Sequence, residues 1–370
     1  NMYQDSEGKV IPGLSVDGAL AAGIPGEPAA LVHIAETYGQ LPLSRSLAPA
    51  IRAARNGFTV TPHYRRMAQF RLKALQASPA AAKVFLWHNE VPPLGQRIKQ
   101  PDLANTLQAL AQQGRAGFYQ GKVAKKLLAG VKKAGGIWST QDFRDYKVIE
   151  RSPIVGSYRG YRIVSAPPPS SGGVALVSML NMLERYRLDH MTSLQRQHVM
   201  VEAMRRAYRD RAEYLGDPDF VDVPVKQLTN KNYAAKLQRS INFKQATPSQ
   251  SLGEIADTSG GNHTTHFSIL DKAGNRVAAT LSINYPFGSG FMPPGTGVLL
   301  NDEMDDFSAK PGVPNVYGLV GAEANAIEPG KRMLSSMSPT FVEAEQGVAI
   351  LGAPGGSRII TMVLHGILAY

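Results

Sequence analysis

The sequence predicts an α+β fold in which helices and stacked β-sheets form separate layers. Segments with apolar residues at helical spacing fill the first part of the chain, and alternating segments rich in β-branched residues gather in its last third. That order is typical of a layered sandwich. With 370 residues and no cysteine, the chain is long enough to bury a core without disulfides or a metal.

Five helices are expected before residue 134. The first has Leu31 and Ile34 at helical spacing, with Pro28 in its first turn. Ser44 is the expected N-cap of the second, and Gly57 follows its last turn. The expected spans are 27–38, 44–56, 64–75, 103–113 and 123–133.

A capped helix, a hairpin and three further helices are expected before residue 239. Ser139 with Asp142 three residues later is a capping signal. Residues 152–165 alternate around an Arg-Gly turn, which predicts a hairpin. Ser193 is the expected N-cap of a long helix. The three helices are expected at 172–186, 193–215 and 230–238, and a polar segment, 242–263, follows them.

A second hairpin follows this polar segment, and Thr264 stands directly before its first strand. Residues 265–270 and 277–283 alternate, separated by a turn. A threonine hydroxyl needs a base to become a nucleophile, and its own α-amine serves once the bond from His263 to Thr264 is cleaved. Alternatively, Thr264 is an ordinary strand residue behind a flexible loop.

The second strand ends in two polar residues on one face, Ser282 and Asn284. If Thr264 begins the neighbouring strand, the hydroxyl of Ser282 is placed to hydrogen-bond to it. The alternative is a polar strand edge that faces solvent.

Four carboxylates lie within five residues of one another, at Asp302, Glu303, Asp305 and Asp306. Packed so closely, they need a cation or solvent to offset their repulsion. The spacing lacks the pattern of a calcium loop, so a solvated turn and a bound cation both remain open.

Two loops of the last third have functional features. Gly355 and Gly356 stand between an expected strand at 348–351 and an apolar helix that begins near Ile359, where N–H groups attract an anion. The alternative is a tight strand-to-helix turn. Residues 308–321 are too rich in proline and glycine for regular structure, as is typical of lids.

Charge and motifs exclude several classes of protein. The net charge of +11 comes from 40 basic and 29 acidic residues. The richest basic stretch, 205–211, is interleaved with acidic residues and lacks a stacking pattern, which indicates a solvated helix face rather than a nucleic-acid site. No apolar run reaches the roughly 18 residues of a membrane span. Dinucleotide, Walker A and helical zinc motifs are absent from the sequence.

Motifs along nearly the whole chain resemble, in order, those of the γ-glutamyltranspeptidases. The matching segments are PPPSSGG at 167–173, YLGDPDF at 214–220, TTHFS at 264–268, GVLLNDEMDDF at 297–307, NVYGL at 315–319, LSSMSPT at 334–340 and GAPGGSR at 352–358. So many ordered motifs are very unlikely to arise by chance, and the sequence is identified as a member of that family.

The resemblance implies the N-terminal-nucleophile hydrolase fold, an αββα four-layer sandwich. It further implies that residues 1–263 belong to a large subunit and residues 264–370 to a small subunit, and that both form one intertwined domain. Set against the family, the chain begins within the large-subunit part and stops within the small-subunit part. We therefore expect a fragment that lacks both ends.

The resemblance also assigns catalytic roles. It implies that the chain cleaves itself at the bond between His263 and Thr264, and that Thr264 then attacks the γ-glutamyl carbonyl. Ser282, where many members of the family carry threonine, keeps the hydroxyl that orients Thr264. The N–H groups of Gly355 and Gly356 would form the oxyanion hole.

The substrate-binding residues follow from the same resemblance. They are Glu303 and Asp306, assisted by Asn284, for the α-ammonium group of the substrate, Ser335 and Ser336 for its α-carboxylate, and Tyr317 in the lid. The arginine that the family also uses for this carboxylate falls before residue 1.

The function implied is that of a γ-glutamyltransferase and glutathione hydrolase, periplasmic or secreted. The substrates would be glutathione and other γ-glutamyl compounds, with water, amino acids or dipeptides as acceptors. The processed subunits would pair with each other, without a cofactor, a metal or nucleic acid. A cephalosporin or glutaryl acylase of the same superfamily is one alternative, although it should not need the residues for the α-ammonium group. An unprocessed, non-catalytic homologue is another.

Overall fold

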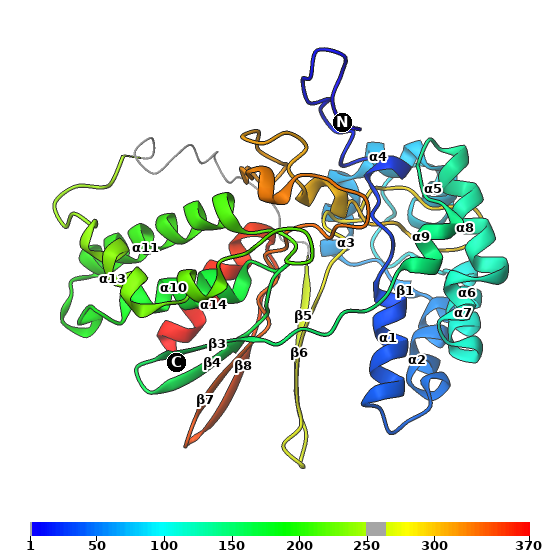
Figure 1. Cartoon of the computed structure of the whole chain (residues 1–370). Helices are drawn as coiled ribbons and strands as arrows, with labels where there is room; N and C mark the ends of the chain where they lie inside the picture. The colour runs from blue at the N-terminus through cyan, green and yellow to red at the C-terminus, as the bar shows by residue number, and fades with distance from the viewer. Residues whose placement is uncertain (1, 249–263) are drawn as a thin grey trace. The chain divides into compact units, whose positions relative to one another are not determined.

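The chain divides into two compact units. The computed structural model describes residues 2–248 and 264–370 (Figure 1). The sheet unit comprises residues 1–10, 151–282 and 305–370, and the helical unit comprises residues 11–150 and 283–304. Each unit therefore contains residues from both sides of the bond between positions 263 and 264. The boundary between the two subunits stays a prediction.

The helical unit contains the helices expected in the first 150 residues. Their buried faces form a core that includes Leu110, Leu127 and Phe143. The capping signal is confirmed, because the Ser139 hydroxyl accepts the N–H of Asp142 and the Asp142 carboxylate accepts the N–H of Ser139. The helices are α1 (Glu27–Thr37), α2 (Leu43–Asn56), α3 (Pro62–Phe70), α4 (Leu72–Ala77), α5 (Pro79–Phe85), α6 (Pro101–Gln113), α7 (Ala116–Tyr119), α8 (Gly121–Lys133) and α9 (Thr140–Asp145).

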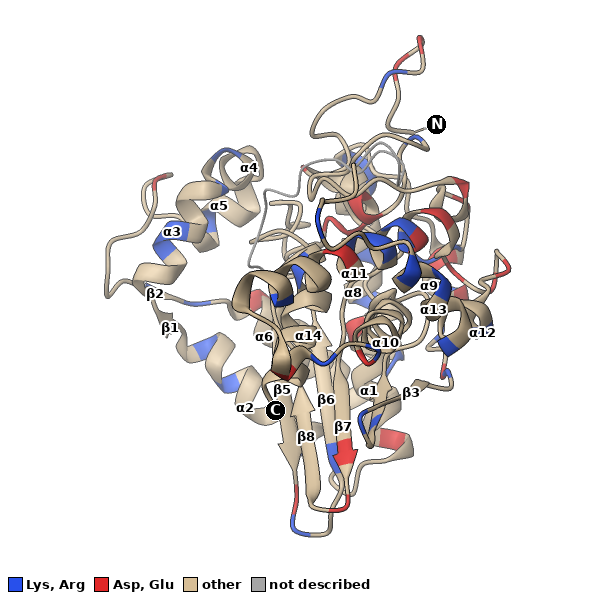
Figure 2. Ribbon diagram, turned by 90° about the vertical axis from the view of Figure 1, so that its left-hand side faces the viewer, with Lys and Arg blue, Asp and Glu red and all other residues tan. Residues whose placement is uncertain are grey.

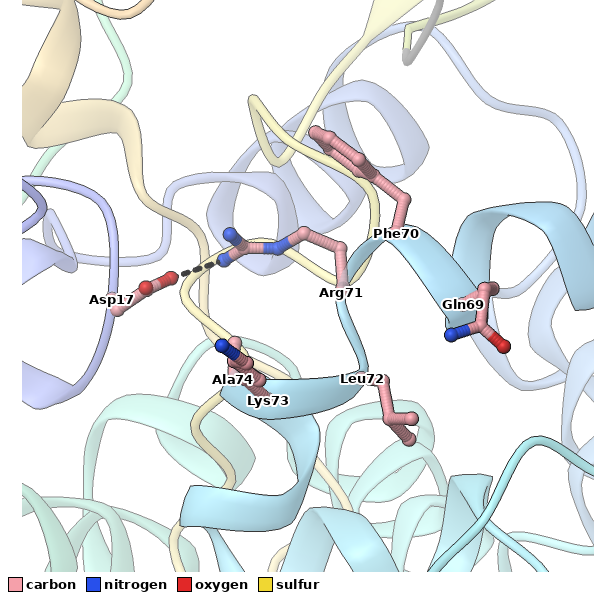
Figure 3. A pocket seen from close by; sticks show the side chains of 7 residues that line it. All are labelled: Asp17, Gln69, Phe70, Arg71, Leu72, Lys73 and Ala74. Atoms are coloured by element: carbon pink, nitrogen blue, oxygen red, sulfur yellow. Dashed lines mark hydrogen bonds and ion pairs between the residues drawn. The ribbon is translucent and has the colours of Figure 1, made fainter.

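The helix expected at 64–75 is broken at Arg71 into α3 and α4. The guanidinium of Arg71 is buried and donates to the Asp17 carboxylate at 2.6 Å and to the Gly288 carbonyl at 2.7 Å. Figure 3 shows this ion pair in a hollow beside α4. A buried guanidinium is costly without such partners. The stabilisation that they provide therefore outweighs that of a continuous helix.

Smaller differences also appear in the helical unit. Ser44 is wrong as the N-cap of α2, because Pro42 holds that position and its fixed φ starts the helix earlier. Two short strands that pair with each other, β1 (Phe58–Thr59) and β2 (Arg97–Ile98), were not expected. At two residues each, they are too short for an alternating pattern to predict.

An antiparallel four-stranded sheet organises the sheet unit, with the order β3-β4-β7-β8 (Figure 1). Its strands are β3 (Ile154–Tyr158), β4 (Tyr161–Ser165), β7 (Thr340–Ala344) and β8 (Gly347–Leu351). The expected hairpin at 152–165 is confirmed as β3 and β4, with Tyr158 paired to Tyr161 across the turn. Ser165 pairs with Thr340, so β4 and β7 join segments that are distant in sequence.

Helices cover this sheet through one shared core. The helix α10 (Gly172–Leu183) is buried along its whole length and packs against β3 and β4. Ile163 and Val342 of the sheet belong to the same buried cluster as residues of α10, α11 (Ser193–Tyr214) and α14 (Ile359–Ala369). Two further helices, α12 (Val225–Leu228) and α13 (Lys231–Arg239), complete this part. The N-cap of α11 is Thr192, whose side chain forms a capping box with Gln195, so the expected cap at Ser193 is wrong by one residue.

The second expected hairpin is confirmed as β5 (Thr265–Leu270) and β6 (Arg276–Leu281). The Ser268 hydroxyl donates to the Ile350 carbonyl of β8 at 3.1 Å, so the hairpin lies against the four-stranded sheet. The α+β class is thus confirmed; the described residues of the sheet unit form two sheets, with a helical layer on the larger one. No helix in the described parts of the chain has the length and hydropathy to cross a membrane.

Candidate active site

Thr264 and Ser282 adjoin the same end of the β5-β6 hairpin. The last pair of the β5-β6 ladder joins Thr265 to Leu281, and the two hydroxyl-bearing residues are the next along each chain. Residues directly opposite in an antiparallel pair have Cβ atoms about 5 Å apart. Both residues are half-buried. The register is therefore consistent with the expected proximity of the two hydroxyl groups. Their catalytic roles remain a prediction.

His266, on the same face of β5 as Thr264, fixes the hairpin against the end of β8. Its Nδ1 lies 2.8 Å from the Thr280 hydroxyl and its Nε2 lies 3.1 Å from the Ser268 hydroxyl. Burial lowers the pKa of His266, which favours the neutral ring. A Cβ atom at Gly352 would lie 2.0 Å from His266 Nδ1, so only glycine allows this approach.

Gly355 and Gly356 follow β8 and lead into α14 through a short 3-10 turn. Their φ angles are 134° and 55°, in the region that favours glycine. Among the described residues, the N–H of neither glycine has an acceptor. Two neighbouring N–H groups without partners at a helix N-terminus are suited to bind a developing oxyanion.

Tyr208 of α11 supports this glycine loop from behind. Its hydroxyl donates to the carbonyl of Ser357, the residue directly after Gly356. Burial raises the pKa of Tyr208 to about 12, so the hydroxyl keeps the proton that it donates.

Ser335 and Ser336 are held by the segment PPPSSGG at 167–173. The N–H of Ser335 donates to the Pro169 carbonyl at 2.9 Å, and the Ser335 carbonyl accepts the N–H of Ser171 at 2.8 Å. Each serine hydroxyl accepts a protein hydrogen bond, from the Met337 N–H at 3.0 Å and from Arg211 Nη2 at 3.2 Å, respectively. A hydroxyl that accepts in this way still has its own proton to donate to a ligand.

Several charged residues of α11 are buried, so the expectation of a solvated face is wrong for them. They are Glu202, Arg206, Asp210 and Arg211. Basic and acidic residues alternate along the helix (Figure 2). Arg206 forms an ion pair with Glu202, and the Asp210 carboxylate accepts the Tyr233 hydroxyl at 3.1 Å. These pairs offset the cost of burying the charged groups. The spacing of charges in the sequence does not show them.

The expected lid is irregular, as predicted, and it covers the glycine loop. Tyr317 is 3% exposed, and a Cβ atom at Gly356 would lie 2.9 Å from its ring. The Asp305 carboxylate accepts the N–H of Val316 at 3.0 Å, which anchors the lid. Asp306 lies near Arg211, whose pKa is lowered by burial and raised by the Asp306 charge, with lowering the net effect.

Two of the expected binding residues, Asn284 and Glu303, belong to the helical unit. Asn284 is buried with φ 68°, and its amide donates to the Asp302 carbonyl at 3.1 Å. The Asp302 carboxylate accepts the N–H of Tyr285 at 2.9 Å. The carboxylates of Asp302 and Asp305 thus bind backbone N–H groups. Residues 2–248 and 264–370 contain no cluster of His, Asp or Glu side chains suited to hold a metal ion.

Two segments with expected site residues flank one end of the four-stranded sheet. Thr340, which begins β7, pairs with Leu351, which ends β8, so the serine pair and the glycine loop flank the same edge. The side chain of His266, two residues after Thr264, lies against Gly352, which directly follows β8. Sequence reasoning missed Tyr208 and Arg211 as supports of this site. The available signal was their position on the apolar stripe of α11 with Met200, Ala203 and Ala207.

The family model described as Gamma-glutamyltranspeptidase matches residues 1–370. The chain is 46% identical over 368 residues to a glutathione hydrolase proenzyme of Pseudomonas sp. (strain A14), covering 98% of this chain and 64% of that protein. It is 43% identical to the glutathione hydrolase proenzyme of Escherichia coli (strain K12), covering 99% of this chain and 64% of that protein. The chain therefore spans less than two thirds of the length of these relatives.

Solved structures agree with this assignment. The γ-glutamyltranspeptidase of Helicobacter pylori matches with a TM-score of 0.66 and 39% identity, over 70% of this chain and 76% of that one. A cephalosporin acylase from Bacillus halodurans matches with a TM-score of 0.81 and 27% identity, over 95% of this chain and 63% of that one. These neighbours confirm the N-terminal-nucleophile hydrolase fold, and with the match of the family model along its whole length, the chain belongs to the γ-glutamyltranspeptidase family.

Proposed function

We propose that the protein is a γ-glutamyltransferase and glutathione hydrolase with Thr264 as its nucleophile. The observation that carries the proposal is the position of Thr264. It directly precedes β5, and Ser282 directly follows β6. Gly355 and Gly356, which follow β8, offer two N–H groups without acceptors among the described residues. A nucleophile, an orienting hydroxyl and oxyanion donors are the parts that acyl transfer requires.

Maturation is the first step of the proposed mechanism. The Thr264 hydroxyl attacks the carbonyl carbon of His263, which itself lies outside the described residues. The peptide C–N bond breaks as an ester forms, and water hydrolyses the ester. Thr264 is left with a free α-amine, which then serves as the base that an internal threonine lacks.

Turnover uses the same hydroxyl. The amine of Thr264 takes the hydroxyl proton as the oxygen attacks the γ-glutamyl carbonyl, and the N–H groups of Gly355 and Gly356 bind the resulting oxyanion. Loss of one such donor typically raises the barrier by about 3 kcal/mol. The amine then protonates the departing amino group, and water or an amino acid resolves the ester.

Recognition of a γ-glutamyl group needs acceptors for its ammonium and donors for its carboxylate. Ser335 and Ser336 are proposed as hydroxyl donors. Asp306, whose charge acts on Arg211 in the same unit, is proposed as an acceptor for the ammonium. In the helical unit, Glu303 and Asn284 carry the remaining polar groups proposed for the ammonium. We propose that Tyr317 covers the bound group, as its contact with Gly356 supports.

The acylase relationship makes a second candidate. The high structural similarity to the cephalosporin acylase from Bacillus halodurans favours a shared scaffold. An acylase of that kind has no use for an ammonium site, so the carboxylates proposed for the substrate's ammonium, Glu303 and Asp306, favour γ-glutamyl substrates. As for its family, we propose that the protein acts in the periplasm or outside the cell.

The test uses the full-length protein. Purified wild type is expected to give two bands on a denaturing gel, with Thr264 at the N-terminus of one of them. It is expected to release p-nitroaniline from γ-glutamyl-p-nitroanilide but not from glutaryl-p-nitroanilide. The variant Thr264→Ala is expected to remain one band and to release none. Release from the glutaryl compound alone would assign the protein to the acylases, and cleavage or turnover by T264A would refute the proposal.

A further inference from the structure

Arg211 is a buried charged residue for which the proposed mechanism has no role so far. It lies on the apolar stripe of α11 and is 4% exposed. No carboxylate among the described residues lies within ion-pairing distance of it, in contrast to Arg206 on the same helix, which pairs with Glu202. A buried cation without an ion pair is costly, so a reason for its place is needed.

One contact of Arg211 leads to the backbone of Ser335. Arg211 Nε donates to the Ser171 hydroxyl at 3.0 Å, and this hydroxyl donates to the Ser335 carbonyl at 2.7 Å. Ser171 belongs to the segment PPPSSGG, which the proposed mechanism does not use otherwise. Arg211 thereby fixes the direction of the Ser171 proton, which in turn holds the serine pair against this segment.

The other contact leads to the side chain of Ser336. Arg211 Nη2 donates to the Ser336 hydroxyl oxygen at 3.2 Å, and the Ser338 hydroxyl donates to the Ser336 carbonyl at 2.9 Å. A guanidinium has no acceptor, so the Ser336 proton cannot be given back to it. The proton must therefore be donated away from Arg211, toward a ligand or solvent.

We propose that Arg211 is a positioning residue for the α-carboxylate of the γ-glutamyl substrate. It directs the Ser336 proton outward and places a positive charge behind the hydroxyl that binds the carboxylate. The bound carboxylate and Arg211 then compensate each other's charge across Ser336. This inference rests on the proposed function, because it takes Ser335 and Ser336 as the carboxylate site.

The test compares full-length variants on two substrates that differ by one group. The first is γ-glutamyl-p-nitroanilide, and the second is 4-aminobutyryl-p-nitroanilide, which lacks the α-carboxylate. For Arg211→Met, kcat/KM on the first is expected to fall by roughly 10- to 100-fold, mainly through KM, since a charge-assisted hydrogen bond is lost. On the second substrate the change is expected to stay within about threefold.

Three further variants complete the design. Arg211→Lys keeps the positive charge but not the planar guanidinium with its several N–H donors. Its kcat/KM is therefore expected to fall less than that of Arg211→Met. Arg209→Met removes an exposed arginine from the same helix, one that pairs with Glu213, and is the matched control with unchanged KM. In Ser336→Ala, adding Arg211→Lys is expected to change kcat/KM little, because the hydroxyl through which Arg211 acts is gone.

Several results would overturn the inference. Arg211→Met that matures normally and keeps its KM for γ-glutamyl-p-nitroanilide would overturn the inference. So would equal losses on both substrates. If Arg211→Met fails to fold, Arg211→Lys decides alone: a loss that is the same with and without Ser336 overturns the inference. Failure of wild type on every γ-glutamyl compound would instead refute the proposed function, on which the inference rests.

Discussion

At the scale of single residues, Gly352 shows how closely the two sheets approach each other. A Cβ atom there would lie 2.0 Å from Nδ1 and 2.1 Å from Cε1 of His266. Gly352→Ala must therefore displace the ring or the strand, and we expect the free energy of unfolding to fall by about 1–3 kcal/mol. Thermal unfolding of the full-length protein measures this as a lower Tm.

The matched control is Gly366→Ala in α14. Its Cβ atom would meet only the Leu351 side chain, at an ordinary 3.6 Å, and alanine favours the helix. An unchanged or slightly higher Tm is expected for the control. If both variants had the same Tm as wild type, the close packing of His266 on Gly352 would be wrong.

Two buried acids on α11 give opposite dependences of stability on pH. Burial alone would raise the pKa of Glu202, but hydrogen bonds from Thr247 and Arg206 lower it to about 2. Its contribution to stability is present above the ordinary pKa and is lost as the pH falls toward 2. Burial raises the pKa of Asp210 to about 6, despite the Tyr233 hydroxyl that lowers it. The contribution of Asp210 is complete below its ordinary pKa and is lost as the pH rises through 6.

The two acids are separated by Glu202→Gln and Asp210→Asn. Glu202→Gln leaves Arg206 buried without its carboxylate and is expected to cost roughly 3 kcal/mol at pH 7, with a smaller loss in acid. Asp210→Asn is expected to remove the decline of the wild type between pH 4 and pH 6. Denaturant unfolding from pH 3 to pH 8 measures both. Parallel profiles for all three proteins would contradict these assignments.

At the scale of elements, regular helices could be predicted from the sequence and their interruptions could not. Apolar spacing locates α1, α6 and α8 because this signal is local. The break at Arg71 depends on Asp17 and Gly288, which are distant in sequence. The buried charges of α11 depend in the same way on partners outside the helix. A local sequence pattern carries no information on polar contacts between residues that are distant in sequence.

The start of α11 tests the structure against the sequence prediction. Thr192 caps the helix, accepting the Gln195 N–H at 3.3 Å, whereas Ser193 is its first residue. Thr192→Ala is expected to lower the free energy of unfolding by about 1 kcal/mol, and Ser193→Ala to leave it nearly unchanged. Chemical denaturation of both variants measures these losses of unfolding free energy. A larger loss for Ser193→Ala than for Thr192→Ala would show that Ser193 is the cap, as the sequence predicts.

At the scale of the whole molecule, the motifs predict candidate site residues, whereas the residues that support them were not predicted. The ordered motifs contain the proposed nucleophile, Thr264, and a proposed carboxylate-binding residue, Ser336. Tyr208 and Arg211 lie in a helix that reads as charged and solvated. Their supporting contacts appear only once α11 is packed against the serine pair and the glycine loop.

The arrangement of the sheets also predicts how the mature protein behaves. Strand β4 precedes the proposed cleavage site and β7 follows it, yet they form a continuous ladder from Arg162–Glu343 to Ser165–Thr340. Cleavage between positions 263 and 264 leaves this ladder and the surrounding core intact. The two polypeptides of the full-length protein are therefore expected to elute together in size-exclusion chromatography at neutral pH and to separate only in denaturant. Thr264→Ala, expected to remain one polypeptide, is the control with the same elution volume. Separation of the wild-type polypeptides without denaturant would contradict a shared sheet.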